Sequence, residues 1–266
     1  MSQMLLAATG TGDEYQPPTV EHAFFFDKIG DGFWITSVKA MTLLGIGAVI
    51  VIAFMLWTSR NAKVVPSKIQ FMGESLYGFV RNNIAVDIMG KKDGLKWAPF
   101  LASLFIFILV LNLFGIVPLA QYPVTSHLAI PAVLSGLVYI IYNVVGIRKH
   151  GFGGYFKMMT IPPGVPVAVL PLVALIEFAS NFIFRPFTLA VRLFANTFAG
   201  HLILTIFGTA TLYLIERASV MSLIAPLSGA MLIIMTFFEL LVACLQAYVF
   251  TVLAAFYIQS ALADEH

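Results

Sequence analysis

Long apolar runs, separated by short polar segments, occupy most of the chain. An apolar run of about 20 residues spans the hydrocarbon layer as one helix, because each helical residue rises about 1.5 Å. This pattern predicts an all-α integral membrane protein with about five membrane-embedded helices. We expect a polar extracytoplasmic segment over residues 1–32 and a single membrane domain over 33–263, with spans at about 38–59, 98–118, 128–147, 165–215 and 219–260.

The last two apolar runs are too long for ordinary spans. A helix over either run would measure roughly 65–75 Å, about twice the thickness of the hydrocarbon layer. Each run could hold two spans joined by a tight turn, or one very long helix. No Pro-Gly or Asn-Gly turn signal lies near the middle of either run, and the isolated Pro186 and Gly200 can kink a helix without ending it. We therefore expect a hairpin of two long, strongly tilted helices, held at that angle by something large beside them.

Composition agrees with a membrane location and suggests an orientation. Hydrophobic residues make up 60% of the chain and charged residues 11%, whereas soluble domains carry about 25% charged residues. Basic residues concentrate in 60–97 and 148–157, so the positive-inside rule makes both segments cytoplasmic. We expect a cytoplasmic basic loop over 60–97, an N-terminus outside and a C-terminus in the cytoplasm. The net charge of +2 gives no indication of a nucleic-acid partner.

One arginine, Arg192, lies close to the middle of the fourth apolar run. An arginine at the bilayer centre costs from about 3 to more than about 10 kcal/mol, so it is a functional hypothesis by default. The guanidinium cannot lose its proton to escape this cost. Arg192 must therefore face water, a carboxylate, or both. A structural ion pair with Glu177 or Glu239 is the alternative explanation.

Helical spacing distributes the other polar residues of this run over two faces. At about 100° per residue, Asn196 shares the face of Arg192, whereas His201 lies about 180° away from it. In the last run, Glu239, Gln246 and Tyr257 are spaced so that they form one polar stripe. Taken singly, a tyrosine near a helix end can be an interface anchor and a lone glutamine can join two helices.

Together these groups are typical of a proton path, because histidine and glutamate can exchange protons near neutral pH and amides can hold a chain of water molecules. The sequence contains no Ser/His/Asp arrangement in a motif context, no glycine-rich phosphate loop and no zinc-ligand spacing. No catalytic residue, cofactor or metal site is therefore predicted.

Three segments resemble subunit a of the F-type ATP synthases, and the resemblance covers about residues 98–263. They are RPFTLAVRLFANTFAGH over 185–201, ELLVACLQAYVF over 239–250 followed by Tyr257, and the less specific NLFGIVP over 112–118. The resemblance implies a stationary, non-catalytic subunit that couples proton flow through two offset half-channels to rotation of a c-ring and to ATP synthesis.

Roles for individual residues also follow from the resemblance. Arg192 would face the proton-carrying carboxylates of the c-ring, and Glu177 would approximate an acid on the cytoplasmic exit side. Some members of the family carry the acid and the histidine at opposite positions, so His201 with Glu239 is one of two arrangements. The residues predicted to take part in proton translocation are Arg192, Asn196, His201, Glu239, Gln246, Glu177 and Tyr257.

The partners implied are the c-ring, the b subunits of the peripheral stalk near the loop 60–97, and the lipid bilayer, in a bacterial plasma (inner) membrane. Two other hypotheses stay open on sequence alone. A secondary transporter could bind an anionic substrate at Arg192, which predicts repeats and broken helices around a closed midplane site. A structural membrane scaffold would instead bury Arg192 in an ion pair.

Overall fold

The computed structural model describes residues 32–60, 67–117, 124–161, 169–216 and 223–263. These ranges contain helices and no strands, and five of their helical stretches are long and apolar enough to cross a membrane. The predicted all-α membrane fold is therefore confirmed. The expected polar segment over 1–32 lies almost wholly outside the described residues, as do residues 217–222.

The first three described helices correct the predicted loop over 60–97. After α3 (Gly32–Arg60), the chain forms α4 (Lys68–Val80), a π-helical turn η1 (Arg81–Val86) and α5 (Asp87–Ile116). Residues 68–97 are therefore helical except at Gly90. Ser67 is the N-cap that begins α4, and its side chain accepts a hydrogen bond from the Gln70 amide at 3.3 Å.

A glycine in the left-handed region turns α5 back against the preceding helix. Gly90 has φ 75°, a conformation that L side chains rarely adopt. Four residues later, a Cβ on Gly94 would lie 2.6 Å from the carbonyl oxygen of Ala85. The backbones of α5 and η1 therefore touch, and only glycine fits between them.

The next element, α6 (Ala129–Thr160), is also longer than the predicted span, which ended at about 147. It follows a 3-10 turn, η2 (Val124–Ser126), and bends at Gly151, which has φ 72°. Beyond the bend, the Tyr155 ring packs over Gly146 and its hydroxyl donates to Asn143 Oδ1 at 3.0 Å. The glycine-rich segment that appeared to be a loop is a helix end folded back on itself.

The last two apolar runs form very long helices. α7 (Leu170–Ala179), the π turn η3 (Ser180–Phe184) and α8 (Arg185–Glu216) are continuous, and α9 covers Ala225–Leu262. Their apolar stretches of 46 and 38 residues would measure about 69 and about 57 Å if straight, so they fit a hydrocarbon layer about 30 Å thick only when strongly tilted. The alternative of two spans in each run is wrong.

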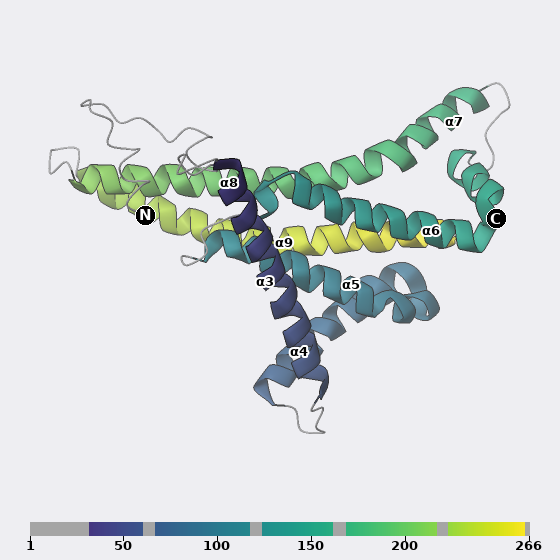
Figure 1. The fold of residues 1–266 in the computed structure, drawn as a ribbon, viewed down its shortest axis with the longest axis horizontal. Coiled ribbons are helices and arrows are strands. Elements are labelled where there is room, and N and C mark those ends of the chain that lie inside the picture. The colour runs from purple at the N-terminus through teal and green to yellow at the C-terminus, as the bar shows by residue number, and fades with distance from the viewer. Residues whose placement is uncertain (1–31, 61–66, 118–123, 162–168, 217–222, 264–266) are drawn as a thin grey trace.

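Figure 1 shows α8 and α9 side by side along the long axis of the molecule, with α3 oriented across that axis. The two helices are also in extensive contact with each other. Pro186 does not end the helix, because the turn before it widens to the π form and the Arg185 amide bonds the Ser180 carbonyl.

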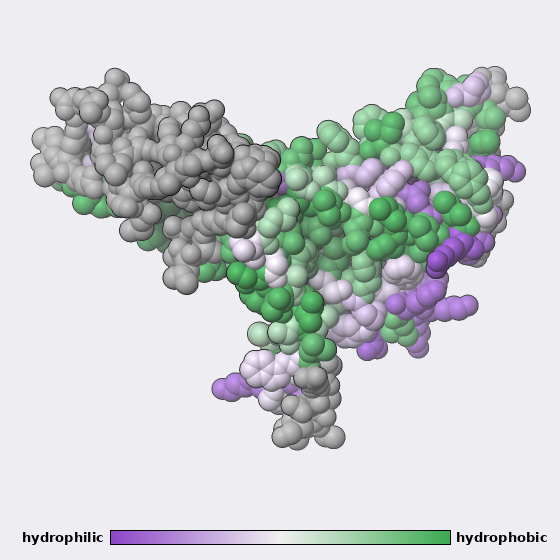
Figure 2. Space-filling model, in the orientation of Figure 1, coloured by the Kyte–Doolittle hydropathy of each residue, from purple (hydrophilic) through white to green (hydrophobic). Residues whose placement is uncertain are grey.

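The core lies where α9 packs on α5 and α6. It is closed by fully buried side chains such as Leu101, Ile108 and Phe250, and by small residues such as Ala254, which let the helices approach closely. Large apolar side chains also cover much of the outside (Figure 2). An apolar exterior of this kind is suited to lipid and not to water.

Charged side chains gather at one end of the molecule. Figure 2 shows hydrophilic surface where α5 begins and α6 ends. The C-terminal end of α9 meets the same region, because Lys149 Nζ donates to the Leu262 carbonyl. The side of the membrane that this end faces stays a prediction from the charge pattern. Its exposed basic residues include Lys91, Lys92, Lys96, Arg148 and Lys157.

The contact at Gly94 generates a first prediction. Gly94→Ala should destabilise the fold by about 1–3 kcal/mol, because the new Cβ meets backbone that cannot move away cheaply. Gly78→Ala in α4 is the matched control, since a Cβ there meets no atom within 4 Å, and it should be neutral or stabilising by up to about 1 kcal/mol. Thermal unfolding in detergent, followed by circular dichroism, measures both; equal midpoints would contradict the predicted contact.

Candidate functional site

Arg192 stands exposed on α8, and it makes no hydrogen bond or ion pair with any residue that the structure describes. In particular, it is not paired with Glu177 or Glu239, so the structural ion pair considered from the sequence is not formed. Ala195 and Ala199 are exposed on the same side of the helix, one and two turns further on. Small residues in these positions leave the arginine accessible to a helix of another chain.

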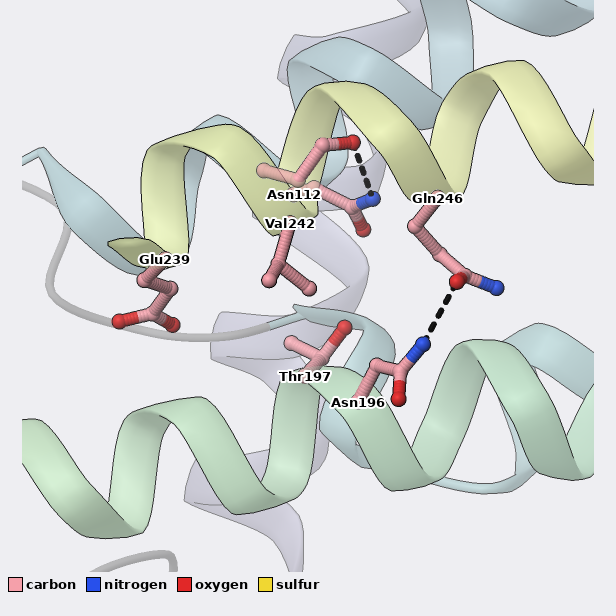
Figure 3. A pocket seen from close by; sticks show the side chains of 7 residues that line it. Asn112, Asn196, Thr197, Glu239, Val242 and Gln246 are labelled. Carbon is pink, nitrogen blue, oxygen red and sulfur yellow. Dashed lines mark hydrogen bonds between the residues drawn. The ribbon is translucent and has the colours of Figure 1, made fainter. Parts of the chain in front are cut away.

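Other polar residues of α8 meet α9. Asn196 Nδ2 donates to Gln246 Oε1 at 2.6 Å (Figure 3). Two turns away, Glu239 is 8% exposed, and a Cβ on Gly200 would lie 3.0 Å from its Oε1 atom. The carboxyl group of Glu239 therefore lies against the bare backbone of α8 at Gly200, next in the chain to His201, which is 7% exposed.

A small pocket opens between these two contacts. Figure 3 shows Glu239 at one end of it and the Asn196–Gln246 pair at the other, with Thr197 and Asn112 between. Glu239 Oε2 and Gln246 Nε2 are buried and have no hydrogen-bond partner within the described part of the protein. The full lining is Asn112, Asn196, Thr197, Glu239, Val242, Ala243 and Gln246.

Two polar lining residues, Thr197 and Asn112, had no role assigned from the sequence. Thr197 lies four residues before His201, so helical spacing could have placed it on the same buried face. Asn112 was quoted only as part of a family motif. Its Nδ2 atom donates to the Ala243 carbonyl at 3.4 Å, across 131 residues of sequence, a contact that no local pattern reveals.

The structure holds Glu177 away from the pocket, in a second polar cluster around the π turn η3. Asn181 Nδ2 donates to Glu177 Oε2 at 3.3 Å and to the Met159 carbonyl at 2.6 Å. The Tyr142 hydroxyl donates to the Asn181 carbonyl at 2.9 Å. These bonds join the far end of α6 to η3, where a widened turn exposes backbone groups to side-chain partners.

Tyr257 belongs to this second cluster and not to the pocket. The Arg185 guanidinium lies over the Tyr257 ring, with Cζ 5.2 Å from the ring centroid, and its Nη1 donates to Ser260 Oγ at 3.2 Å. Glu239, Gln246 and Tyr257 are all buried along α9, as one stripe would be. Tertiary packing divides that stripe between two clusters.

No group of three or more His, Cys, Asp or Glu side chains lies together among the residues searched, which are those that the structure describes. Along the helical run from α7 to α8, Arg192 comes between the two clusters. Glu177 precedes it by about 22 Å of helix and His201 follows it by about 14 Å.

The fold and the site together define a multi-pass, all-helical membrane protein whose buried polar groups follow two long packed helices. A family model described as ATP synthase A chain matches residues 40–259. ATP synthase subunit a of Pseudarthrobacter chlorophenolicus is 43% identical over 270 residues, covering 100% of both chains, and that of Nocardioides sp. is 41% identical over 269 residues, covering 97% of both. The chain belongs to the ATP synthase subunit a family. That membership makes it a component of the ATP synthase complex and, with its apolar helices, a multi-pass protein of the bacterial plasma membrane.

The contact between Gly200 and Glu239 generates a second prediction. Gly200→Ala should destabilise the chain by about 1 kcal/mol, because the Glu239 carboxyl must shift within a packed interface. In a Glu239→Ala background the same change should cost nothing measurable, because the atoms that the new Cβ meets are gone. Gly208→Ala on the same helix is the control, since a Cβ there meets no atom within 4 Å.

Thermal unfolding of the four proteins of this double-mutant cycle measures the coupling. If Gly200→Ala costs the same with and without Glu239, the carboxyl group does not lie against α8.

Proposed function

We propose that this chain is the stationary proton-path subunit of an F-type ATP synthase, without catalytic activity of its own. In this proposal it forms two offset half-channels against a c-ring and so couples proton flow to rotation and ATP synthesis. The single observation that carries the proposal is the exposed Arg192 side chain, which has no partner in the described part of its own chain.

The cost of that charge argues for a partner on another chain. Arg192 stands on a face of α8 where Ile203, eleven residues further on, is also exposed, so without a partner its guanidinium would face hydrocarbon. Such exposure costs at least about 3 kcal/mol, and an approaching carboxylate removes much of this cost. A ring of helices that presents one carboxylate after another fits this face, because Ala195 and Ala199 permit close contact.

The pocket between α8 and α9 supports an outer half-channel. Glu239 and His201 supply groups that can take up and release protons. Asn196 and Gln246, joined by a hydrogen bond of 2.6 Å, lead from that pair towards the face of Arg192. The exposed Asn196 side chain would be the last polar group before the ring carboxylate.

The second cluster supports an exit on the other side of Arg192. Glu177 would receive the proton released by the ring, and Asn181 would orient its carboxylate through their 3.3 Å contact. Tyr257 would hold Arg185 at the edge of this path. The charged end of the molecule would face the cytoplasm, where the α4–α5 region would meet the b subunits of the peripheral stalk.

The proposed proton-transfer cycle follows from the free-energy cost of placing an ionised carboxylate in lipid. A proton from the Glu239 side neutralises a ring carboxylate, and the neutral group can then move through hydrocarbon, where the ion could not go cheaply. After nearly a full turn the group reaches the exit and loses its proton. Arg192 favours the ionised form and obstructs a direct leak between the half-channels, which would waste about 2.3 kcal/mol per proton for each 100 mV.

Two observations weigh against the other hypotheses. A transporter would enclose its substrate-binding arginine in a closed midplane site, whereas Arg192 lies on the outer surface of the described chain. A structural scaffold would pair the arginine within the chain, and no such pair is formed among the described residues.

The third prediction tests the role of Arg192 in vesicles that carry the assembled complex. Arg192→Ala should abolish ATP-driven proton pumping while the complex still assembles, because the ring carboxylate loses the charge that favours its ionised form. Quenching of a pH-sensitive dye measures pumping, and the yield of intact complex measures assembly. Arg148→Ala is the control, since it removes an exposed arginine outside both clusters.

Each outcome of this experiment separates the hypotheses. Normal pumping by Arg192→Ala would overturn the proposed function. Loss of assembly would favour the scaffold instead.

The fourth prediction concerns the outer half-channel. Glu239→Gln and His201→Ala should each slow proton flux without preventing assembly, because each removes a group that can bind and release a proton. Glu74→Gln is the control for the loss of a carboxylate, since Glu74 is exposed on α4 and bonded to Gln70 at 2.7 Å. Unchanged flux in both pocket variants would remove Glu239 and His201 from the path.

A further inference from the structure

A short polar turn is buried deep among the helices of this protein. η2 (Val124–Ser126) has no exposed residue, and Thr125 has a relative exposure of 0%. The turn is in contact with α5, α6 and α8. Non-helical backbone within a membrane protein is tolerated where protein buries it or where it borders an aqueous cavity. Nothing in the resemblance or in the pattern of the sequence assigned this segment a role.

The Thr125 hydroxyl connects two walls of the pocket. It lies 3.1 Å from Asn112 Oδ1 on α5 and 2.9 Å from Thr197 Oγ1 on α8. Thr197 Oγ1 is in turn 3.0 Å from the Leu193 carbonyl. All three side chains are buried, and both Asn112 and Thr197 line the pocket between Glu239 and Gln246.

A count of hydrogen atoms shows that the two hydroxyl groups can be distributed over these three contacts in three arrangements. A threonine hydroxyl carries one hydrogen and can donate once, whereas Asn112 Oδ1 can only accept. If Thr197 donates to the Leu193 carbonyl, Thr125 can donate to Thr197 or to Asn112, but not to both. If Thr197 donates to Thr125 instead, Thr125 is free to donate to Asn112.

Each of the three arrangements makes two hydrogen bonds, and they differ only by rotation of hydroxyl groups. The Leu193 carbonyl lies within the helix α8 and can accept the Thr197 hydroxyl or do without it. No proton is gained or lost by either threonine. A pocket wall with this property can match its donors and acceptors to a water chain whose orientation reverses each time a proton passes.

We propose that Thr125 is a positioning residue of the outer half-channel: with Asn112 and Thr197 it forms a reorientable hydrogen-bond chain that orders water in the pocket between Glu239 and the Asn196–Gln246 pair. This inference rests on the proposed function. It extends the polar path from the two long helices to α5 and η2. The hydroxyl of Thr125, and not the shape of its side chain, is the group that matters.

Comparison of valine and serine at position 125 tests this role in the assembled complex. Thr125→Val keeps the shape and removes the hydroxyl, and should slow ATP-driven proton pumping per assembled complex by about threefold to tenfold. Thr125→Ser keeps the hydroxyl and should pump at nearly the rate of the unaltered protein. Thr251→Val is the matched control, because Thr251 is 0% exposed and, among the described residues, its hydroxyl bonds only the Ala247 carbonyl of its own helix.

A purely structural role predicts different results. If Thr125 only joined helices, the valine variant would reduce the yield of complex, and the complexes that did assemble would pump normally. Normal pumping by assembled Thr125→Val would therefore overturn the inference. Equal slowing by valine and serine would overturn it as well, because side-chain shape would then be the cause. If Thr125→Val does not assemble, the same comparison of valine and serine at Thr197 decides whether the hydroxyl groups of this hydrogen-bond chain affect proton pumping.

A double-mutant cycle gives an independent readout. Thr125→Val and Thr197→Val interrupt the same chain, so the double variant should pump no more than about twofold more slowly than the slower single variant. If the slowing factors of the two single variants multiply in the double variant, the two hydroxyls act independently and the proposed hydrogen-bond chain is overturned. The Arg192→Ala variant separates this inference from the proposed function: if Arg192→Ala stops pumping while Thr125→Val does not slow it, only the role of Thr125 fails.

Discussion

The Arg192 guanidinium keeps its charge at any usable pH, and the apolar surface around it cannot solvate that charge. Glu177 and Glu239 do not pair with it, because one lies by Asn181 and the other against Gly200. The exposed face of α8 is therefore incomplete in the isolated chain. Its small residues and the exposed Arg192 fit the proposed partner, a c-ring that presents a carboxylate at the same depth.

The length of α8 and α9 determines how the polar groups can be separated. Helices of ordinary length, perpendicular to the membrane, would bring every intramembrane polar group close to the same two surfaces. A continuous run from Leu170 to Ile215 instead keeps Glu177 and His201 about 36 Å apart along the helix, with Arg192 between them. In the proposed function, this separation lets proton uptake and release occur at different places beside the c-ring.

Close approach of α8 and α9 makes the buried polar groups compatible with lipid surroundings. Gly200 admits the Glu239 carboxyl, and the Asn196–Gln246 hydrogen bond satisfies a side-chain donor that hydrocarbon could not. α5 and η2 close the remaining side through Asn112 and Thr125. The helices are therefore held together by contacts that also form the walls of the pocket.

The sequence by itself determined the class of the fold, the two long helices and the position of Arg192 near the middle of its apolar run, because hydrophobic run length and the cost of charge are local properties. It missed the helices over 68–97, where polar residues concealed the Ser67 cap, and it read Glu239, Gln246 and Tyr257 as one group. Only the tertiary structure decided which groups meet. Contacts such as those of Asn112 with Ala243 and of Thr125 with Thr197 join residues that are 131 and 72 positions apart, and their partners depend on how whole helices pack, which no local spacing encodes.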